Sequence, residues 1–251
     1  MKICYKDNNV TIVQGDCMEV MARCTKQFDM CVTDPPYGTT RNGWDTVIPF
    51  DDMWTQIHRL VKEDGAICLF GGEPFASMLR CSNIKEYKYD WVWHKNNVTG
   101  FLNSKKQPLR CVETISVFYR KQPLYIPQMR TGFKPYTAVH NGHTSNYGYE
   151  SGAVTVSNGD RFPIQILDIK CSPNGSKLHP TQKPVELLEY LIKTYTSEGE
   201  RVLDFTMGSG TTLIAGLNTG RKVVGIEMDE QYCEVAKQRV LDWYKEHCVN
   251  E

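Results

Sequence analysis

The residues best suited to chemistry lie at the end of an apolar run, in the stretch "VTDPPYGTT" at 32–40. Proline has no backbone N–H and restricts the residue before it, so Pro35 and Pro36 end the strand and hold Asp34 extended. The carboxylate of Asp34 and the backbone carbonyl of Pro35 then form two rigid acceptors beside the flat ring of Tyr37. An ordinary strand-to-loop turn with a capping aspartate is the alternative interpretation.

A second group lies in "RVLDFTMGSGTTLIAG" at 201–216, where a buried strand runs through glycines into a helix. Gly208 and Gly210 permit a close approach of the backbone, and the helix N-terminus favours a carboxylate or a phosphate. The next strand ends at Glu227, which is well placed to bind a ribose diol. This pattern suits either a dinucleotide or S-adenosylmethionine (AdoMet).

Two details favour AdoMet over a dinucleotide. The dinucleotide fingerprint requires a small residue three positions after Gly210, where this chain has Leu213. Only 24 residues follow Glu227, whereas a dinucleotide fold begins with the glycine unit and adds further strands after it. The remaining strands must therefore come from the N-terminal half, and the sheet is permuted.

The elements that position both groups are strands that alternate with helices, which predicts an α/β fold with a parallel, doubly wound sheet. Apolar runs predict strands over 9–16, 28–34, 66–70, 89–95, 113–120, 201–205 and 222–227. Helical spacing of apolar residues predicts helices over 17–24, 50–62, 71–79, 183–195, 211–218 and 231–244.

The segment 121–178 differs from both flanks because it has no helical period and contains 5 Pro, 6 Gly and 6 aromatic residues. Such composition is typical of a loop-rich surface lobe. Net charge is zero overall, but residues 84–184 contain 14 Lys and Arg against 6 Asp and Glu, a balance of +8. This distribution is typical of a lobe that binds a polyanion, with chance clustering as the alternative.

The bulk composition is that of an ordinary globular protein, with 41% hydrophobic and 23% charged residues in a chain of 251. No apolar run approaches the roughly 18 residues of a membrane span, and we expect a cytoplasmic protein because the N-terminus lacks an apolar signal segment. The ten cysteines show no CxxC spacing, so we expect reduced, mostly buried thiols. The histidines of "HNGH" at 140–143 lack nearby partners, and no metal site is expected.

These motifs resemble those of amino-group DNA methyltransferases of the beta arrangement. In that family the catalytic Asp-Pro-Pro-Tyr comes first, a target-recognition region follows, and the AdoMet-binding glycine loop comes last. The resemblance covers nearly the whole chain and is carried, in order, by "QGDCMEVM" (14–21), "TDPPYG" (33–38), "HPTQKPVELLEYLI" (179–192), "LDFTMGSGTT" (203–212) and "GIEMDEQYCEVAKQRV" (225–240).

The resemblance implies a Rossmann-like, circularly permuted AdoMet-dependent methyltransferase sheet with a loop-rich target-recognition insertion. Residues 1–120 would form the catalytic half, 121–178 the target-recognition region and 179–251 the AdoMet-binding half. The implied activity is transfer of a methyl group from AdoMet to the N6 amino group of adenine in double-stranded DNA, on a base turned out of the duplex.

The resemblance also assigns roles to individual residues. In the catalytic Asp34, Pro35, Pro36 and Tyr37, the Asp34 carboxylate and the Pro35 carbonyl would accept the two amine N–H groups, and Tyr37 would stack on the base. Around AdoMet, Asp16 would take the adenine amino group, Glu227 the ribose, and Thr181 and Lys183 the methionine end, with Asp204, Phe205, Gly208, Ser209, Gly210 and Thr211 lining the rest. Helix capping is the alternative for Asp16 and Asp204, and a structural role is as good an interpretation for His179.

Candidate DNA contacts are basic residues interleaved with aromatic ones. They are Lys105, Lys106, Arg110, Arg120, Lys121, Arg130 and Lys134, with Tyr125, Phe133 and Tyr136 between them. Trp44 would close over the flipped base or pack its own loop. A homodimer is an alternative to a monomer, and a restriction endonuclease partner would have to be a separate chain.

Three other activities compete with adenine methylation. Cytosine N4 is the first, although relatives acting there often carry serine at the position of Asp34, which favours adenine. An RNA or protein amide methyltransferase is the second, but those generally lack the permuted order and the basic lobe. A non-catalytic protein that binds AdoMet and DNA is the third, and the intact catalytic motif argues against it.

Overall fold

The computed structural model describes residues 1–39, 45–140, 153–171 and 182–247. These residues form two compact units. The larger unit comprises Met1–Ile126 with Gln165–Glu251, and the smaller comprises Pro127–Ile164.

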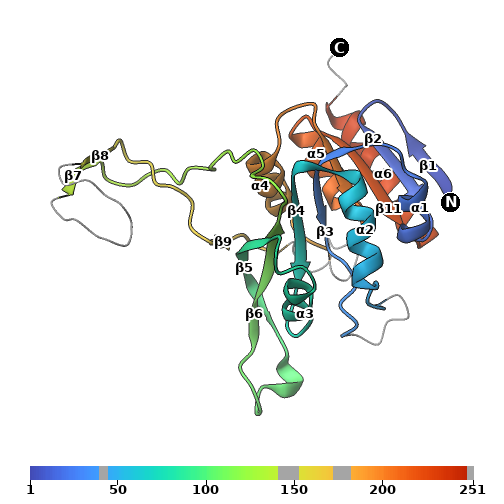
Figure 1. Ribbon diagram of the computed structural model, residues 1–251, viewed down its shortest axis with the longest axis horizontal. Helices are drawn as coiled ribbons and strands as arrows, with labels where there is room; N and C mark the ends of the chain where they lie inside the picture. The colour runs from blue at the N-terminus through green and yellow to red at the C-terminus, as the bar shows by residue number, and fades with distance from the viewer. Residues whose placement is uncertain (40–44, 141–152, 172–181, 248–251) are drawn as a thin grey trace. The chain divides into compact units, whose positions relative to one another are not determined.

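The larger unit is built on a nine-stranded sheet in the order β1-β2-β11-β10-β3-β4-β6-β5-β9 (Figure 1). Its strands are β1 (Lys2–Lys6), β2 (Val10–Gln14), β3 (Phe28–Thr33), β4 (Val61–Gly71), β5 (Tyr87–Thr99), β6 (Arg110–Phe118), β9 (Ile166–Asp168), β10 (Arg201–Asp204) and β11 (Lys222–Glu227). The C-terminal strands β10 and β11 lie between the N-terminal strands β2 and β3, as the permuted order predicts.

The expectation of a parallel sheet is correct for the five adjacent strands β2, β11, β10, β3 and β4, and for the pair of β5 and β9 at the far edge. Strand β1 is antiparallel to β2, and β6 is antiparallel to both β4 and β5. A short connection that contains the 3₁₀ turn η1 (Phe101–Asn103) joins β5 to β6. A connection this short allows antiparallel pairing, whereas parallel neighbours need a long crossover.

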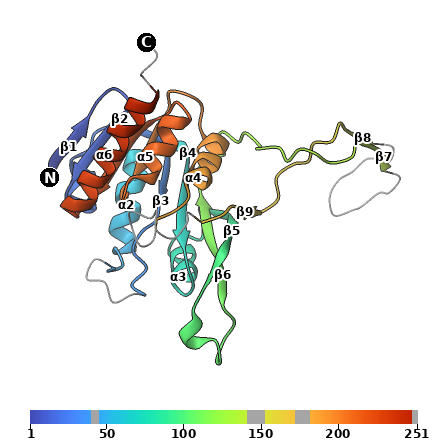
Figure 2. The same ribbon diagram turned by 180° about the vertical axis from the view of Figure 1, so that it is seen from behind.

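Helices cover both faces of the sheet, as the two opposite views show (Figures 1 and 2). Helices α1 (Cys17–Arg23), α2 (Phe50–Leu60) and α3 (Phe75–Ser82) share one apolar cluster with the sheet. Helices α4 (Val185–Tyr195), α5 (Thr211–Asn218) and α6 (Glu230–His247) share the other. Successive strand residues alternate between the two clusters, as Met30, Cys31 and Val32 of β3 do, because strand side chains have a period of two.

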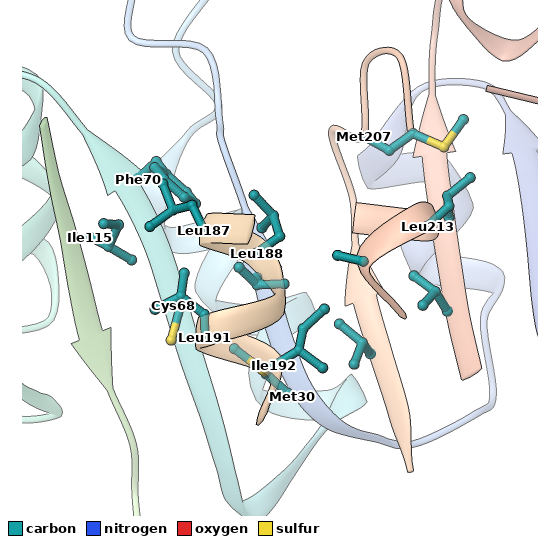
Figure 3. Packing of buried hydrophobic residues seen from close by; sticks show 14 of the residues in the cluster. Met30, Cys68, Phe70, Ile115, Leu187, Leu188, Leu191, Ile192, Met207 and Leu213 are labelled. Carbon is teal, nitrogen blue, oxygen red and sulfur yellow. The ribbon is translucent and has the colours of Figure 1, made fainter. Parts of the chain in front are cut away.

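Helix α4 anchors the central strands close to the point where they end. Leu187, Leu188, Leu191 and Ile192 pack against residues of β3, β4 and β6 (Figure 3). Each of these four α4 side chains is at most 2% exposed. This packing holds the segment that begins α4 next to the carboxyl ends of β3 and β4.

The smaller unit is a two-stranded antiparallel ribbon of β7 (Tyr136–His140) and β8 (Ala153–Ser157) with extended arms. The backbones of Arg130 and Arg161 exchange two hydrogen bonds of 2.8 Å across the arms. The guanidinium of Arg161 lies over the rings of Phe133 and Tyr136, at 5.3 and 4.5 Å from their centroids. The expected loop-rich segment 121–178 contains this unit but also includes β9, which instead joins the main sheet through β5.

Other expectations from composition can be compared with the described residues. Nine cysteines are described and none forms a disulfide, but only three are buried, so the expectation of mostly buried thiols was wrong. Across the described residues we find no cluster of His, Cys, Asp and Glu that could hold a metal ion, and most of "HNGH" lies outside them. Among the described helices, none has the length and apolar character needed to cross a bilayer.

Leu191→Ala should destabilise the larger unit by about 2–5 kcal/mol, because it removes a fully buried side chain and leaves a cavity between α4 and the sheet. Leu102→Ala is the matched control. Leu102 lies in η1 and is fully exposed, so the same change there should cost less than about 0.5 kcal/mol. Urea unfolding followed by far-UV circular dichroism measures both, and equal effects would contradict the packing of α4 described here.

Candidate active site

A cavity of about 650 Å³ opens at the carboxyl edge of the central strands. Its walls are the segments that follow β2, β3, β10 and β11, together with residues at the start of α4. Parallel α/β sheets bind ligands at this edge because the loops after adjacent strands meet there. The volume lies within the usual range for small-molecule sites.

The carboxylate of Asp34 lies on the wall of this cavity, directly after β3. Its Oδ1 accepts a hydrogen bond of 2.5 Å from the Tyr37 hydroxyl, and its Oδ2 is paired with the ammonium of Lys183. Burial, reinforced by the charge of Asp34, raises the pKa of Tyr37, so its phenol stays protonated and remains a donor. One face of the Tyr37 ring stacks on Phe75, with centroids 4.9 Å apart, so only the opposite face could receive a base.

A buried network joins the Asp34 loop to the loop after β10. The Oδ1 of Asp204 accepts from the Thr33 hydroxyl at 2.7 Å, and its Oδ2 accepts from the Thr212 hydroxyl at 2.5 Å. The hydroxyl of Thr206 lies 2.6 Å from that of Thr33 and donates to the backbone carbonyl of Asp34 at 3.0 Å. The two loops therefore hold a common geometry, although they are distant in sequence.

The glycine loop after β10 packs tightly against helix α6. Gly210 has a φ of +77°, and a Cβ placed on it would lie only 2.8 Å from the Cβ of Ala236. Arg239 of α6 donates to the backbone carbonyl of Ser209 at 2.7 Å. The position of Gly210 thus depends on contact with α6, and Gly210 is not among the residues that line the cavity.

Two carboxylates face the cavity beside the glycine loop. Glu227 accepts from the backbone N–H groups of Gly208 and Asp229, both at 2.9 Å, and burial raises its pKa despite these bonds. Each carboxylate oxygen can accept more than one hydrogen bond, so Glu227 retains capacity for ligand hydroxyls. Asp16 caps α1 by accepting from the N–H groups at positions 18 and 19, so it has the capping role as well as a place on the cavity wall.

Most residues expected at the site lie together on the cavity wall. They are Asp16, Asp34, Pro35, Pro36, Tyr37, Lys183, Asp204, Phe205, Gly208, Ser209, Thr211 and Glu227. Thr181, His179 and Trp44 lie outside the described residues. Lys183, expected at the methionine end of AdoMet, directs its ammonium to Asp34 and to Glu113.

The structure adds lining residues that sequence reasoning missed. Asp45 is 8% exposed and accepts from the backbone N–H groups of Gly38 and Thr39, so it shapes the loop after the catalytic turn. Asp229 lies two residues after Glu227, a spacing that could have drawn attention to it. No sequence signal distinguished Asp45, which reaches these groups only through the fold of its loop.

The candidate DNA contacts divide between the two units. Lys105, Lys106 and Arg110 are exposed around the connection of β5 and β6 in the larger unit. Arg130 and Lys134 belong to the smaller unit, where the Nε of Arg130 donates to a backbone carbonyl. Two further candidates have partners within the larger unit, since Arg120 donates to the Val61 carbonyl and Lys121 pairs with Glu63.

Burial raises the pKa of Asp204 to about 6, although hydrogen bonds from Thr212 and Thr33 oppose the shift. Because this pKa is higher in the folded protein than in the unfolded chain, the folded protein holds the proton more tightly. The free energy of unfolding therefore falls as pH rises from about 4 to 6 and the proton is lost. Asp204→Asn should remove this loss, so its stability relative to wild type should improve by on the order of 3 kcal/mol from pH 4 to pH 7. Urea unfolding of both proteins at the two pH values tests this, and a constant difference between them would contradict it.

Comparison with known proteins places the chain among DNA-modifying enzymes. The DNA methylase family profile matches residues 28–238. A putative methylase, YubD of Escherichia coli K12, is 27% identical, with 91% of this chain and 88% of that protein aligned. The type II methyltransferase M2.MboI of Moraxella bovis is 26% identical over 93% of this chain and 88% of its own length.

Solved structures share the fold. The M1.HpyAVI–SAM complex matches with a TM-score of 0.62 and 24% identity, covering 92% of this chain and 99% of that one. The cytosine-N4-specific PvuII DNA methyltransferase matches with a TM-score of 0.68 and 17% identity, covering 97% of this chain and 94% of that one. Since the family profile extends from β3 through the glycine loop into α6, the chain belongs to the DNA methylase family of N6 and N4 amino-group methyltransferases.

Proposed function

We propose that this DNA methylase transfers a methyl group from AdoMet to the N6 amino group of adenine in double-stranded DNA. The observation that carries the proposal is the placement of the Asp34 carboxylate on the wall of a cavity that it shares with the glycine loop. The hydroxyl of Thr206 links the Asp34 backbone to the loop after β10, so acceptor and cofactor loop are held together.

The cavity residues suit AdoMet, the methyl donor of this family. Glu227 offers a half-buried carboxylate for ribose hydroxyls, and Asp16 lies on the same wall for the adenine amino group. The loop from Phe205 to Ser209 lines the same cavity as Glu227, Asp16 and Asp34. When bound, AdoMet supplies an electrophilic methyl group on a positively charged sulfur.

Asp34 would act on the amine rather than on the methyl group. The lone pair of an exocyclic amine is delocalised into the ring, which makes the nitrogen a poor nucleophile. A carboxylate that accepts one N–H, with the rigid Pro35 carbonyl accepting the other, would localise the lone pair on the nitrogen and direct it toward the methyl group. The nitrogen would then form the new bond to the methyl carbon, the electron pair of the broken bond would remain on the sulfur, and the methylated nitrogen would lose one proton to solvent.

The substrate must leave the duplex before its amino group can reach this cavity. Exposed Lys105, Lys106 and Arg110, within the segment of net charge +8, suit contacts with the DNA backbone. Adenine is favoured over cytosine because an aspartate, rather than a serine, stands at position 34.

Wild-type protein incubated with labelled AdoMet and unmethylated genomic DNA should place the label in N6-methyladenine. Asp34→Ala should lower this transfer by at least about 100-fold and still bind AdoMet, because it removes an acceptor that acts on the amine. Asp64→Ala, an exposed acid of β4, is the matched control and should be unaffected. Digestion to nucleosides and mass spectrometry provide the measurement.

Each other result of this assay has a defined meaning. Label in N4-methylcytosine would keep the mechanism and reject the use of Asp34 as the selector of adenine. Label in neither nucleoside, with AdoMet bound, would reject the proposed DNA substrate. Full transfer by Asp34→Ala would reject the assigned role of that carboxylate.

Glu227→Gln should weaken AdoMet binding by roughly 10- to 100-fold, which is the usual cost of losing a hydrogen bond to a charged group. The substitution keeps the side-chain volume and an oxygen that can accept from the backbone. Glu230→Gln is the control, because Glu230 is exposed and pairs with Lys2. Isothermal titration calorimetry measures both affinities, and equal values would exclude Glu227 from the cofactor site.

A further inference from the structure

Four charged side chains of alternating sign form a row that ends at Asp34. Lys95 Nζ lies 2.8 Å from Glu113 Oε1, and Glu113 Oε2 lies 3.3 Å from Lys183 Nζ. Lys183 in turn pairs with Asp34 Oδ2. The two lysine side chains are each 10% exposed and Glu113 is 20% exposed, so the row is largely removed from solvent.

Strand register explains how this row reaches the catalytic carboxylate. Strand β4 runs parallel to β3 and antiparallel to β6, with Gly71 at its carboxyl end paired to Thr114. Glu113 precedes Thr114 and therefore lies at the edge of the sheet where Asp34 follows β3. Strand β5 adds Lys95 at the same edge, since Trp93 is the register partner of Glu113 and Lys95 lies two residues further along β5.

Charges in such a position are stable only when they compensate one another. Burial alone would raise the pKa of Glu113, but the charges of Lys183 and Lys95 lower it. Burial would lower the pKa of Lys183, but Asp34 and Glu113 raise it. Glu113 Oε2 accepts no hydrogen bond from the described residues, so its charge is balanced there by the Lys183 ammonium.

We propose that Glu113 is a positioning residue for methyl transfer. Its carboxylate holds the Lys183 ammonium against Asp34 and offsets the positive charge of Lys183, while the Lys95 ammonium offsets the negative charge of Glu113. This inference rests on the proposed function of Asp34. It assigns a task to a carboxylate that is not among the residues lining the cavity.

Methyl transfer would depend on Glu113 because its carboxylate keeps the net charge of the row at zero. The reaction brings a sulfonium cation to the site and develops positive charge on the amine. With Glu113 present, two lysines balance two carboxylates, and Asp34 keeps a charged partner without an excess of positive charge. The other titratable groups near the row are Tyr37, which interacts with the charges of Asp34, Glu113 and Asp45, and Asp204, which interacts with the charge of Asp34. Their interactions with Asp34 remain in every variant used below.

Opposite pH effects follow for the two single variants. Glu113→Gln leaves an excess positive charge, so the Lys183 pKa should fall and the alkaline limit of the transfer rate should move to lower pH by about one unit or more. Lys95→Met leaves an excess negative charge in the row, so the acid limit of the transfer rate should move to higher pH. The double variant restores neutrality and should move both limits back toward wild type.

The experiment measures single-turnover methyl transfer to PCR-amplified bacterial genomic DNA between pH 5 and 10. Because the Lys183 pKa is raised in the wild type, an alkaline limit set by Lys183 is expected within this range only for Glu113→Gln. Glu113→Gln should be roughly 10- to 100-fold slower near pH 8, since misplacing a catalytic group has effects of this size. Glu63→Gln removes the same charge from an exposed pair with Lys121 and is the matched control. Retained AdoMet binding confirms that each variant is folded.

The proposal is overturned if the single variants lose rate with neither limit moved, or if the double variant is slower than both. If Glu113→Gln does not fold, Lys95→Met decides the matter, and an unshifted acid limit then overturns the proposal. The pKa of Lys183 in the free protein, followed by NMR of the lysine side chain, provides a readout without DNA. If wild-type protein leaves DNA unlabelled while Glu113→Gln still changes the Lys183 pKa, the proposed function and the role of Glu113 in methyl transfer are rejected. The electrostatic coupling between Glu113 and Lys183 would stand.

Discussion

The buried carboxylate of Asp204 is the interaction on which the site depends. It accepts hydrogen bonds from Thr33 at the end of β3 and from Thr212 in α5, and so joins the Asp34 turn to the glycine unit. A carboxylate in this position is costly to bury, and its raised pKa expresses that cost. The cost is offset because three hydrogen-bond donors surround it, including the backbone N–H of Thr206.

The same edge of the sheet concentrates charge from distant parts of the chain. Asp34, Lys183 and Glu113 come from the turn after β3, the segment before α4 and the middle of β6. Packing of α4 on β3 and β4 brings the Lys183 ammonium to Asp34, and the antiparallel pairing of β6 brings Glu113 behind it. The carboxylate that we propose accepts an amine N–H thus has charged neighbours that local sequence does not reveal.

Local patterns predicted the elements well where each pattern spans a whole helix or strand. Apolar spacing identified α2, α4 and α6, and the proline pair identified the end of β3. The antiparallel pairing of β5, β6 and β1 could not be predicted in this way, because strand direction depends on connections and partners. Strand β9 was missed because three residues are too few to show a period.

The residue types and spacings in the chain were sufficient to identify the family and to predict the Asp34 turn and the glycine loop, since these motifs are contiguous and each depends on local backbone chemistry. Tertiary structure decided which charges meet. The ammonium of Lys183 pairs with Asp34 and Glu113, Asp16 caps a helix, and Gly210 faces α6 rather than the cavity. Such pairings follow from strand register and helix packing, which bring together Asp34 and Lys183 although they are 149 positions apart in the sequence.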